Sequence, residues 1–335
     1  MPAVHRPLQT RDRFVQEFGT RSVRYADVLA AGFSRASLQA AVDRDLLRRP
    51  RRGVLVAVPA QGAVDPPGAH VLSIRSTIAA LGPGVWASHE SAASHQGVSI
   101  PFESALDRVQ LITPEGAGFT GPGLAVRAAP LPFCDREVVD GIPTTSVART
   151  AVDVARGRRL ASALIPLDSA ARLLIARVSS TSGNELRRAV RDPELRALAT
   201  AALEDALSHC VGWAGTVAVR TALHHVDPAS ESAFESRSRG WFIEAGLGAL
   251  DPGRPIPCAG KIYWADFCSD ERRVVGEADG WSKYGQSPEE IRTALEAERA
   301  RQRDLERDGW RVVRWSTRDR RNAVVHRMRT ALLTA

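Results

Sequence analysis

The sequence predicts an α+β chain made of several domains. Its 335 residues exceed the roughly 250 at which a single hydrophobic core usually stops growing. Apolar segments with helical spacing alternate along it with short apolar runs that are typical of strands. Hydrophobic residues make up 44% and charged residues 25% of the chain, close to the averages of globular proteins, which argues against a disordered chain or a coiled rod.

Composition also limits the partners and the compartment. Lys and Arg number 45 against 38 Asp and Glu, and the resulting pI of about 9.9 suits a polyanionic partner such as nucleic acid. Cys134, Cys210, Cys258 and Cys268 form no CxxC pair, which argues against a zinc ribbon or a disulfide framework and favours a reducing cytoplasm. Because no apolar run approaches the length of a membrane span, we expect no membrane contact.

The first domain is expected over residues 1–58. Two short helical patterns between Arg24 and Val58 are broken by Gly32, and Ser34 is placed to cap the second helix. An Arg-rich stretch and an apolar run follow, so the order is helix, turn, helix and β wing. This order is typical of a winged-helix DNA-binding domain. The alternative for its basic residues is a solvated face that binds nothing.

Seven side chains of this domain are the candidate DNA contacts. Three on or just beyond the second helix are expected to face the groove, and four arginines near the wing are expected to hold phosphates. The groove-facing residues are Arg35, Gln39 and Arg44, and the phosphate-binding residues are Arg48, Arg49, Arg51 and Arg52. A homodimer on two half-sites is one arrangement that the sequence leaves open.

A linker rich in Pro and Gly, residues 59–68, separates this domain from the middle of the chain. Residues 70–157 mix a helix with short apolar runs at 109–113 and 124–128, which predicts a central α+β domain. Residues 158–228 are rich in Ala, Leu and Arg at helical spacing, with turns at 179–184 and 211–215. They predict a helical connector.

The last domain is expected over residues 229–335, with the element order α, β, β, α, β. The predicted elements are a helix at 232–245, strands at 261–268 and 273–278, a long helix, and a strand at 310–315. Ser287 to Glu290 form a capping box with Pro at the first helical position, and Gly309 ends the long helix. This pattern predicts an α/β domain.

Three carboxylates of the last domain are expected to converge. Asp266 lies on one predicted strand, and Glu277 and Asp279 lie two apart on the next, so the latter two share a face. With suitable pairing Asp266 joins them. Carboxylates that crowd together repel unless a cation neutralises them, and oxygen ligands are what Mg²⁺ or Mn²⁺ prefers. We therefore expect a Mg²⁺ or Mn²⁺ site, and no organic cofactor.

Two further residues could serve phosphodiester hydrolysis at this site. Glu235 shares a helix face with Glu231 and is a candidate fourth ligand or water-positioning base. Lys283 is the nearest lysine that could stabilise developing charge. The alternative is that the three carboxylates only form ion pairs with the arginines at 299, 301 and 303.

Several motifs in the last hundred residues occur in an order that resembles an actinobacterial domain of unknown function related to very-short-patch-repair endonucleases. That group belongs to the PD-(D/E)XK superfamily. The motifs are Glu231 to Glu235, Ala265-Asp266-Phe267, Gly276 to Gly280 with Lys283-Tyr284, Arg301 to Asp304, and Gly309 to Trp315.

The resemblance implies a restriction-endonuclease-like fold and a set of site residues. Asp266 and Glu277 are the implied metal ligands, with Asp279 and Glu235 as further acidic members. Lys283 is implied as a displaced catalytic lysine, and Gln302 as a helix residue that faces the site. Asp279 stands where the superfamily usually has its lysine, so the resemblance speaks more strongly for the fold than for catalysis.

Motifs upstream resemble AbiEi-type antitoxins over residues 20 to 160. They are Tyr25 to Ser34, Leu46 to Arg48, Arg52 to Val56, Ser88 to Ala93 and Gly141 to Asp153. In that family a winged helix binds promoter DNA, and a cognate toxin is an implied partner. His89-Glu90 and His224-His225 have no partners at ligand spacing, so structural roles are expected for them.

Two functions of different classes follow from the sequence. The first is a Mg²⁺-dependent DNA endonuclease, in phage defence or DNA repair, whose N-terminal domain holds the DNA. The second is an AbiEi-like transcriptional autoregulator or antitoxin with an inactive nuclease fold. Trp281, Trp310 and Trp315 flank the acidic motif and could stack on bases, although core packing is expected for Trp310 and Trp315.

Overall fold

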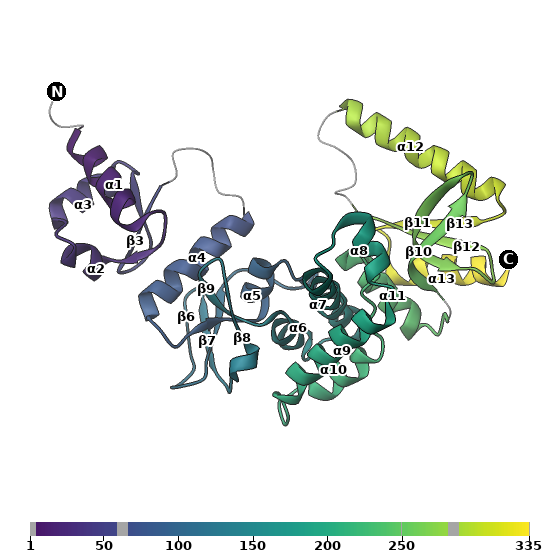
Figure 1. Ribbon diagram of the computed structural model, residues 1–335, viewed down its shortest axis with the longest axis horizontal. Helices are drawn as coiled ribbons and strands as arrows, with labels where there is room; N and C mark the ends of the chain where they lie inside the picture. The colour runs from purple at the N-terminus through teal and green to yellow at the C-terminus, as the bar shows by residue number, and fades with distance from the viewer. Residues whose placement is uncertain (1–4, 59–65, 249, 281–287, 335) are drawn as a thin grey trace. The chain divides into compact units, whose positions relative to one another are not determined.

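The computed structural model describes residues 5–58, 66–248, 250–280 and 288–334 (Figure 1). The chain divides into two compact units. Residues 1–97 and 104–146 form the first, and residues 98–103 and 147–335 form the second. The fold is mixed α and β, as the sequence predicts.

The first unit begins with a small helical segment closed by a three-stranded antiparallel sheet in the order β1-β3-β2. Phe14, Val28, Leu38 and Leu55 are buried in its core. The helix, turn, helix and hairpin expected between Arg24 and Val58 are present, preceded by a helix that the sequence pattern did not predict. The elements are α1 His5–Phe18, β1 Val23–Arg24, α2 Tyr25–Ala30, α3 Arg35–Asp43, β2 Leu47–Arg51 and β3 Val54–Ala57.

A six-stranded mixed sheet in the order β6-β7-β5-β4-β9-β8 follows. Ile74 packs on Leu111, Val126 and Ile142 in its core. The predicted strands at 109–113 and 124–128 are confirmed as β5 and β7. The elements are α4 Pro66–Leu81, β4 Trp86–Ala87, α5 His89–Gln96, β5 Val109–Thr113, β6 Phe119–Gly121, β7 Leu124–Ala128, the 3-10 helix Phe133–Asp135, β8 Arg136–Val139 and β9 Ile142–Thr145.

The second unit opens with a run of helices. The prediction of only two interruptions was wrong, because a third break precedes α9, where Asp192 accepts hydrogen bonds from the amides of Glu194 and Leu195 and Pro193 begins the helix. An Asp cap followed by Pro is a standard helix start. The helices are α6 Val147–Ala155, α7 Leu160–Ser179, α8 Gly183–Ala189, α9 Pro193–Ser208 and α10 Thr216–Leu223.

The unit ends in a four-stranded sheet in the order β10-β11-β12-β13, in which β12 and β13 are parallel and the other pairs antiparallel. Phe242 and Met328 pack on one face of the sheet beside Trp315, and Leu305 packs on the other face beside Val275. The elements are α11 Ala233–Glu244, β10 Asp251–Cys258, β11 Lys261–Ser269, β12 Val274–Asp279, α12 Pro288–Arg307, β13 Arg311–Ser316 and α13 Arg321–Leu333.

This order corrects the predicted α, β, β, α, β pattern by adding a strand, β10, after the first helix and a helix, α13, at the end. β10 contains Pro252, Pro255 and Pro257, which cannot donate to a ladder and are tolerated on edge strands. Trp310 and Trp315 are 6% and 2% exposed, so the expected core role is confirmed for both. Trp281 lies outside the described residues.

Candidate functional site

Asp266 lies where β11 leaves its partner β12. The two strands pair at Phe267 with Gly276, Cys268 with Val275 and Ser269 with Val274. One residue earlier, the Oδ2 atom of Asp266 accepts a hydrogen bond of 2.8 Å from the backbone amide of Ala278. The carboxylate is thereby held against β12, beside Glu277.

Glu277 is almost completely buried, and one of its oxygens binds an arginine. Its residue is 1% exposed, and Oε1 accepts a hydrogen bond of 2.7 Å from Nη2 of Arg301 on α12. The same Nη2 donates to the backbone oxygen of Trp264 at 2.5 Å. The alternative that the carboxylates pair with nearby arginines is therefore seen in one contact of Glu277, the one with Arg301.

Asp279, at the end of β12, is bound by an arginine from the neighbouring strand. Nε and Nη2 of Arg314 donate to its two oxygens at 3.1 and 3.0 Å, and Nη1 of Arg314 donates to Glu298 at 2.6 Å. Burial lowers the pKa of Arg314, but the hydrogen bonds to Asp279 and Glu298 outweigh it and leave that pKa above its usual value. Asp279, Arg314 and Glu298 thus form a separate charged cluster.

Glu235 closes a capping box at the start of α11. Its backbone amide donates to Oγ of Ser232 at 3.2 Å, and that hydroxyl donates back to Oε1 at 2.7 Å. The amide of Glu231 donates to Oε2 at 2.7 Å. The spacing of Ser232 and Glu235 matches the Ser-x-x-Glu pattern of a capping box. The sequence therefore contained a signal for this structural role.

The other two candidates of the last domain are placed as follows. Lys283 lies outside the described residues. Gln302 on α12 donates to Glu306, one turn further along the same helix, at 2.8 Å. The structure thus brings Asp266 to the strand that carries Glu277, and gives Asp279, Glu235 and Gln302 partners of their own.

The donor chemistry of Asp266 and Glu277 fits a hard divalent cation. Mg²⁺ is usually held by one or two carboxylates and keeps several waters for substrate oxygens to replace. Over the residues that the structure describes, no three carboxylates of this cluster have oxygens that all lie within 4.8 Å of one another. The expected convergence of three carboxylates is therefore not seen among the described residues.

An arginine from outside the last domain also reaches this region, and no sequence signal predicted it. Nε and Nη2 of Arg187 on α8 donate to the two oxygens of Glu231 at 2.6 and 2.8 Å. Its guanidinium carbon lies 5.6 Å from the centre of the Trp264 ring. Arg172 on α7 donates to Glu231 as well, at 3.2 Å. Such contacts arise from tertiary packing, which spacing along the chain does not encode.

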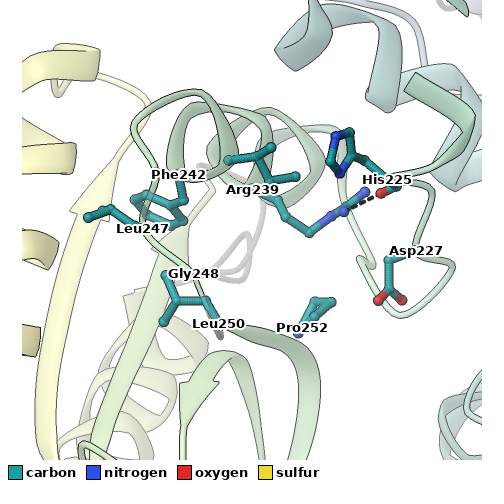
Figure 2. Close-up of a pocket in the computed structure, with 10 residues that line it drawn as sticks. His225, Asp227, Arg239, Phe242, Leu247, Gly248, Leu250 and Pro252 are labelled. Carbon is teal, nitrogen blue, oxygen red and sulfur yellow. Dashed lines mark hydrogen bonds between the residues drawn. The ribbon is translucent and has the colours of Figure 1, made fainter. Parts of the chain in front are cut away.

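A buried ion pair fixes α11 on α7 nearby. Nη2 of Arg239 donates to both oxygens of Asp168, at 2.6 and 2.7 Å, and the two side chains are 8% and 0% exposed. Figure 2 shows Arg239 extending from α11 toward the backbone oxygen of His225, which accepts a hydrogen bond from Nη1. The cavity beside it measures about 330 Å³ and is walled by Phe242, Leu247, Leu250 and Pro252, among others.

On the first unit, α3 carries the predicted groove-facing residues. Oγ of Ser34 caps the helix by accepting from the amide of Ser37 at 3.1 Å, as predicted. Arg35 and Arg44, at its two ends, are exposed, and neither makes an ion pair or side-chain hydrogen bond within the described part of the chain. Gln39 is exposed too, but its amide binds Asp43 at 2.6 Å and Arg49 at 2.8 Å.

The four arginines near the wing differ in their surroundings. Arg48 forms two hydrogen bonds of 2.8 Å with Asp45, which raise its pKa, and Arg49 binds Gln39. Arg51 donates to the backbone oxygen of Gly123 at 3.4 Å. Arg52 is exposed and makes no such contact among the described residues. Arg35, Arg44 and Arg52 are therefore the cations best placed to meet an external anion.

The histidine motifs have structural surroundings. His89 is 7% and Glu90 9% exposed, and Glu90 accepts a hydrogen bond of 2.6 Å from Gln110. The burial and this contact favour the structural role expected for His89-Glu90. Within the described ranges, no helix is long and apolar enough to cross a membrane.

Comparisons with known proteins find relatives of this chain. Two proteins of Mycobacterium tuberculosis, Uncharacterized protein MT2308 of strain CDC 1551 / Oshkosh and Uncharacterized protein Rv2248 of strain ATCC 25618 / H37Rv, are each 30% identical over 176 residues. The match covers 52% of this chain and 55% of each relative. The chain therefore spans about half the length of these relatives.

A solved structure, the crystal structure of the RV2827C protein from Mycobacterium tuberculosis, matches with a TM-score of 0.37 at 16% identity, over 66% of this chain and 81% of that one. With a TM-score this low, the match does not establish a shared fold.

Residues 84–205 match the family described as AbiEi antitoxin C-terminal domain. The resemblance expected over residues 20 to 160 is thus supported from residue 84 onward and extends into the helices up to α9, so this part of the chain is similar to AbiEi antitoxins.

Proposed function

We propose that the chain is a DNA-binding regulator similar to AbiEi antitoxins, in which residues 5–58 form a winged helix that contacts DNA. The observation that carries this proposal is α3, whose two ends present Arg35 and Arg44 to solvent without internal partners in the described residues. In helix-turn-helix proteins the N-terminal part of the second helix contacts base edges. The match of residues 84–205 to the AbiEi antitoxin domain supports the same class.

Some of the arginines near the wing are offset by neighbouring side chains, so the cationic surface is confined to a few positions. Asp45 offsets Arg48, and Gln39 ties Arg49 to the helix. Arg52 on the wing extends the cationic surface beyond α3. We expect Arg35 and Arg44 to contact bases or flanking phosphates, and Arg52 to contact phosphate only.

The test is fluorescence anisotropy with duplex DNA from upstream of the protein's own coding sequence and with an unrelated duplex. Arg35→Ala/Arg44→Ala should weaken binding to the upstream duplex by about tenfold or more and lower the salt slope by about 2, because each phosphate contact contributes about 0.9. The matched control is Arg188→Ala/Arg220→Ala, which removes the same charge from exposed positions on α8 and α10. Equal loss in both double variants would refute the proposal.

The partners and compartment follow as parts of this proposal. The AbiEi similarity supports a cognate toxin as a protein partner. We further propose a homodimer on the DNA and a cytoplasmic location. Light scattering of the protein alone and on the duplex gives the stoichiometry. Co-purification with the product of an adjacent gene tests the toxin.

A second candidate function is Mg²⁺- or Mn²⁺-dependent hydrolysis of DNA at Asp266 and Glu277. The observation that favours it is the placement of both carboxylates where β11 and β12 part, with Glu277 buried beside Asp266. The sheet order, with α12 crossing over to a strand parallel to β12, supports the resemblance to the PD-(D/E)XK group. When bound, the ion would polarise the phosphoryl oxygen and lower the pKa of a water ligand.

In this second candidate the protein's own groups have separate tasks. Asp266 and Glu277 would hold the ion through one oxygen each, with Ala278 and Arg301 fixing the other oxygens. Asp279 and Glu235 would keep the end of β12 and the start of α11 in place. No cation among these residues is assigned to the phosphate.

Nicking of supercoiled plasmid in Mg²⁺, Mn²⁺ or EDTA tests this function, with Asp266→Asn and Glu277→Gln as site variants. Glu296→Gln, at an exposed position on α12, is the matched control. Activity that needs metal, is lost in both site variants and survives in the control is the expected result. Binding without nicking in any metal would leave the DNA-binding regulator alone.

A further inference from the structure

Arg187 stands beside the acidic strand although it comes from the helices before the last domain. It lies on α8, within the region similar to the AbiEi antitoxin domain. Its Nε and Nη2 donate to Glu231, while Nη1 has only Asn184, at 3.3 Å, among the described contacts. About a third of the side chain is exposed. The guanidinium therefore keeps both donor capacity and access to solvent.

The position of this guanidinium is fixed relative to Asp266. It lies over the ring of Trp264 at 5.6 Å, and Trp264 is two residues before Asp266 on β11. The carboxylates of Glu231, Glu235 and Asp266 all raise the pKa of Arg187, with the hydrogen bonds to Glu231 the largest cause. Arg187 is thus a fixed positive charge at the edge of the acidic cluster.

The other described arginines of this region are committed to carboxylates inside the fold. Arg301 binds Glu277 and the backbone of Trp264 through one nitrogen, and its Nε is buried. Arg314 is held between Asp279 and Glu298. A phosphate that approached Asp266 would meet negative charge unless a cation accompanied it. Among the arginines that the structure describes in this region, Arg187 is the one that is about a third exposed and keeps a nitrogen without a carboxylate partner.

We propose that Arg187 forms a phosphate subsite beside Asp266, and that its ligand is a phosphodiester of the DNA backbone. This inference rests on the second candidate function. Guanidinium binds phosphate through paired hydrogen bonds. Glu231 occupies those donors when no DNA is bound and yields them to the phosphate. The nuclease-like domain is therefore incomplete without α8, which supplies the cation that the sequence motif lacks at position 279.

The subsite makes a prediction that a merely structural ion pair does not. If Arg187 only braces Glu231, then removing either partner should have the same effect on DNA binding. If Arg187 binds phosphate, Arg187→Ala should weaken binding, whereas Glu231→Gln should leave it unchanged or strengthen it by releasing the guanidinium. Arg172 continues to hold the loop in either variant through the backbone oxygen of Pro228.

The experiment measures binding of a fluorescein-labelled 12-base-pair duplex in Ca²⁺, which supports binding without hydrolysis in many Mg²⁺ nucleases. It uses the full chain carrying Arg35→Ala/Arg44→Ala, so that α3 does not dominate the signal. Arg187→Ala should weaken binding about tenfold, the loss expected for a hydrogen bond to a charged group. Arg187→Lys should fall between, and Arg188→Ala, the next residue on α8, should stay within about twofold of the parent.

Three outcomes would overturn the subsite: equal effects of Arg187→Ala and Arg188→Ala, a loss in Glu231→Gln as large as in Arg187→Ala, or no binding by the parent. Thermal unfolding of each variant separates misfolding from lost contact, and Arg187→Lys serves if the alanine variant unfolds. Selective loss of binding in a parent that never nicks plasmid would retain the subsite and refute hydrolysis. If wild type nicks plasmid and Arg187→Ala nicks it equally well, hydrolysis would be retained and the subsite refuted.

Discussion

Arg239 on α11 and Asp168 on α7 form an ion pair inside the second unit, through hydrogen bonds of 2.6 and 2.7 Å from one guanidinium nitrogen to both carboxylate oxygens. The backbone amide of Asp227 donates to the same carboxylate at 2.9 Å. This pair ties the helix that begins with Ser232 and Glu235 to the helices matched by the AbiEi family. The orientation of α11 therefore depends on α7.

Asp168→Ala should destabilise the protein by about 3–5 kcal/mol, because it leaves the guanidinium of Arg239 buried without its partner. Urea unfolding monitored by circular dichroism gives the difference. Glu271→Ala, at a side chain 78% exposed in the turn after β11, is the control and should change stability by less than about 0.5 kcal/mol. A loss below about 1 kcal/mol in Asp168→Ala would contradict the importance of the pair.

Gly240→Ala should also loosen the contact between α11 and α7. A Cβ atom at Gly240 would lie 2.8 Å from Cβ of Ala161 and closer still to its Cα, so the helices would have to move apart at a cost of about 1–3 kcal/mol. Gly121→Ala has open space around the added methyl and should be nearly neutral. The melting temperature of Gly240→Ala should be lower than that of Gly121→Ala. Similar melting temperatures would refute the close packing of the two helices.

Ser34→Ala removes the cap of α3 and should cost about 1 kcal/mol. Because α3 carries Arg35 at its first position, binding of the upstream duplex should weaken along with stability. Ser34→Asp restores an acceptor and should recover most of the stability. An alanine variant as stable as wild type would show that Oγ of Ser34 contributes nothing.

Asp319 makes stability depend on acidity. The hydrogen bond from the amide of Ser316 lowers the pKa of Asp319 from its usual value. The side chains of Arg327 and Ser316 lower it further, and burial opposes them. A carboxyl group whose pKa is lower in the folded state stabilises the fold above its unfolded pKa, and that contribution is lost as the pH falls through the folded value. Between about pH 6 and about pH 3, wild type should therefore lose more stability than Asp319→Asn. Parallel curves for the two proteins would exclude this role.

The thiols should differ sharply in reactivity. Cys134 is exposed, whereas Cys210, Cys258 and Cys268 are buried, and burial raises the pKa of Cys258 and of Cys268. Since the thiolate is the reactive form, Ellman's reagent should find one fast thiol per folded chain and four after denaturation. The Cys134→Ser variant should have no fast thiol.

Elements with a clear local pattern could be predicted from the sequence. β5 and β7 are short apolar runs bounded by Gly and Pro, and β11, β12 and β13 were found within a residue or two for the same reason. β10 was missed because its three prolines forbid a central strand, and only its position at the sheet edge permits it. α1 was missed because its buried positions are Pro7, Thr10 and Phe14, of which only Phe14 gives a strong hydrophobic signal.

The candidate site divides in the same way. The expectation that strand pairing brings Asp266 to the strand of Glu277 agrees with the bond from the amide of Ala278 to Asp266, since that relation is local to two neighbouring strands. The capping role of Glu235 corrects the expected catalytic one, and the spacing of Ser232 and Glu235 is its signal in the sequence. The contacts of Arg187 with Glu231, and of Arg314 with Asp279, join residues 44 and 35 positions apart. Their encounter depends on helix packing and strand order, which spacing does not reveal.

The path of the chain between its units has a practical consequence. Residues 98–103 belong to the second unit although the first resumes at Ser104. There Phe102 stacks on Arg237 at 3.9 Å, Glu103 pairs with Arg158 at 3.3 Å, and the amide of Ser99 binds Ser169 at 2.9 Å. A fragment that starts at Val147 would lack residues 98–103. A fragment that ends at Ser146 would contain them but would lack Arg237, Arg158 and Ser169, which they contact. Expression of either half alone should therefore yield poorly behaved protein, and a gene fusion that separates the two would have to carry residues 98–103 along with the second half.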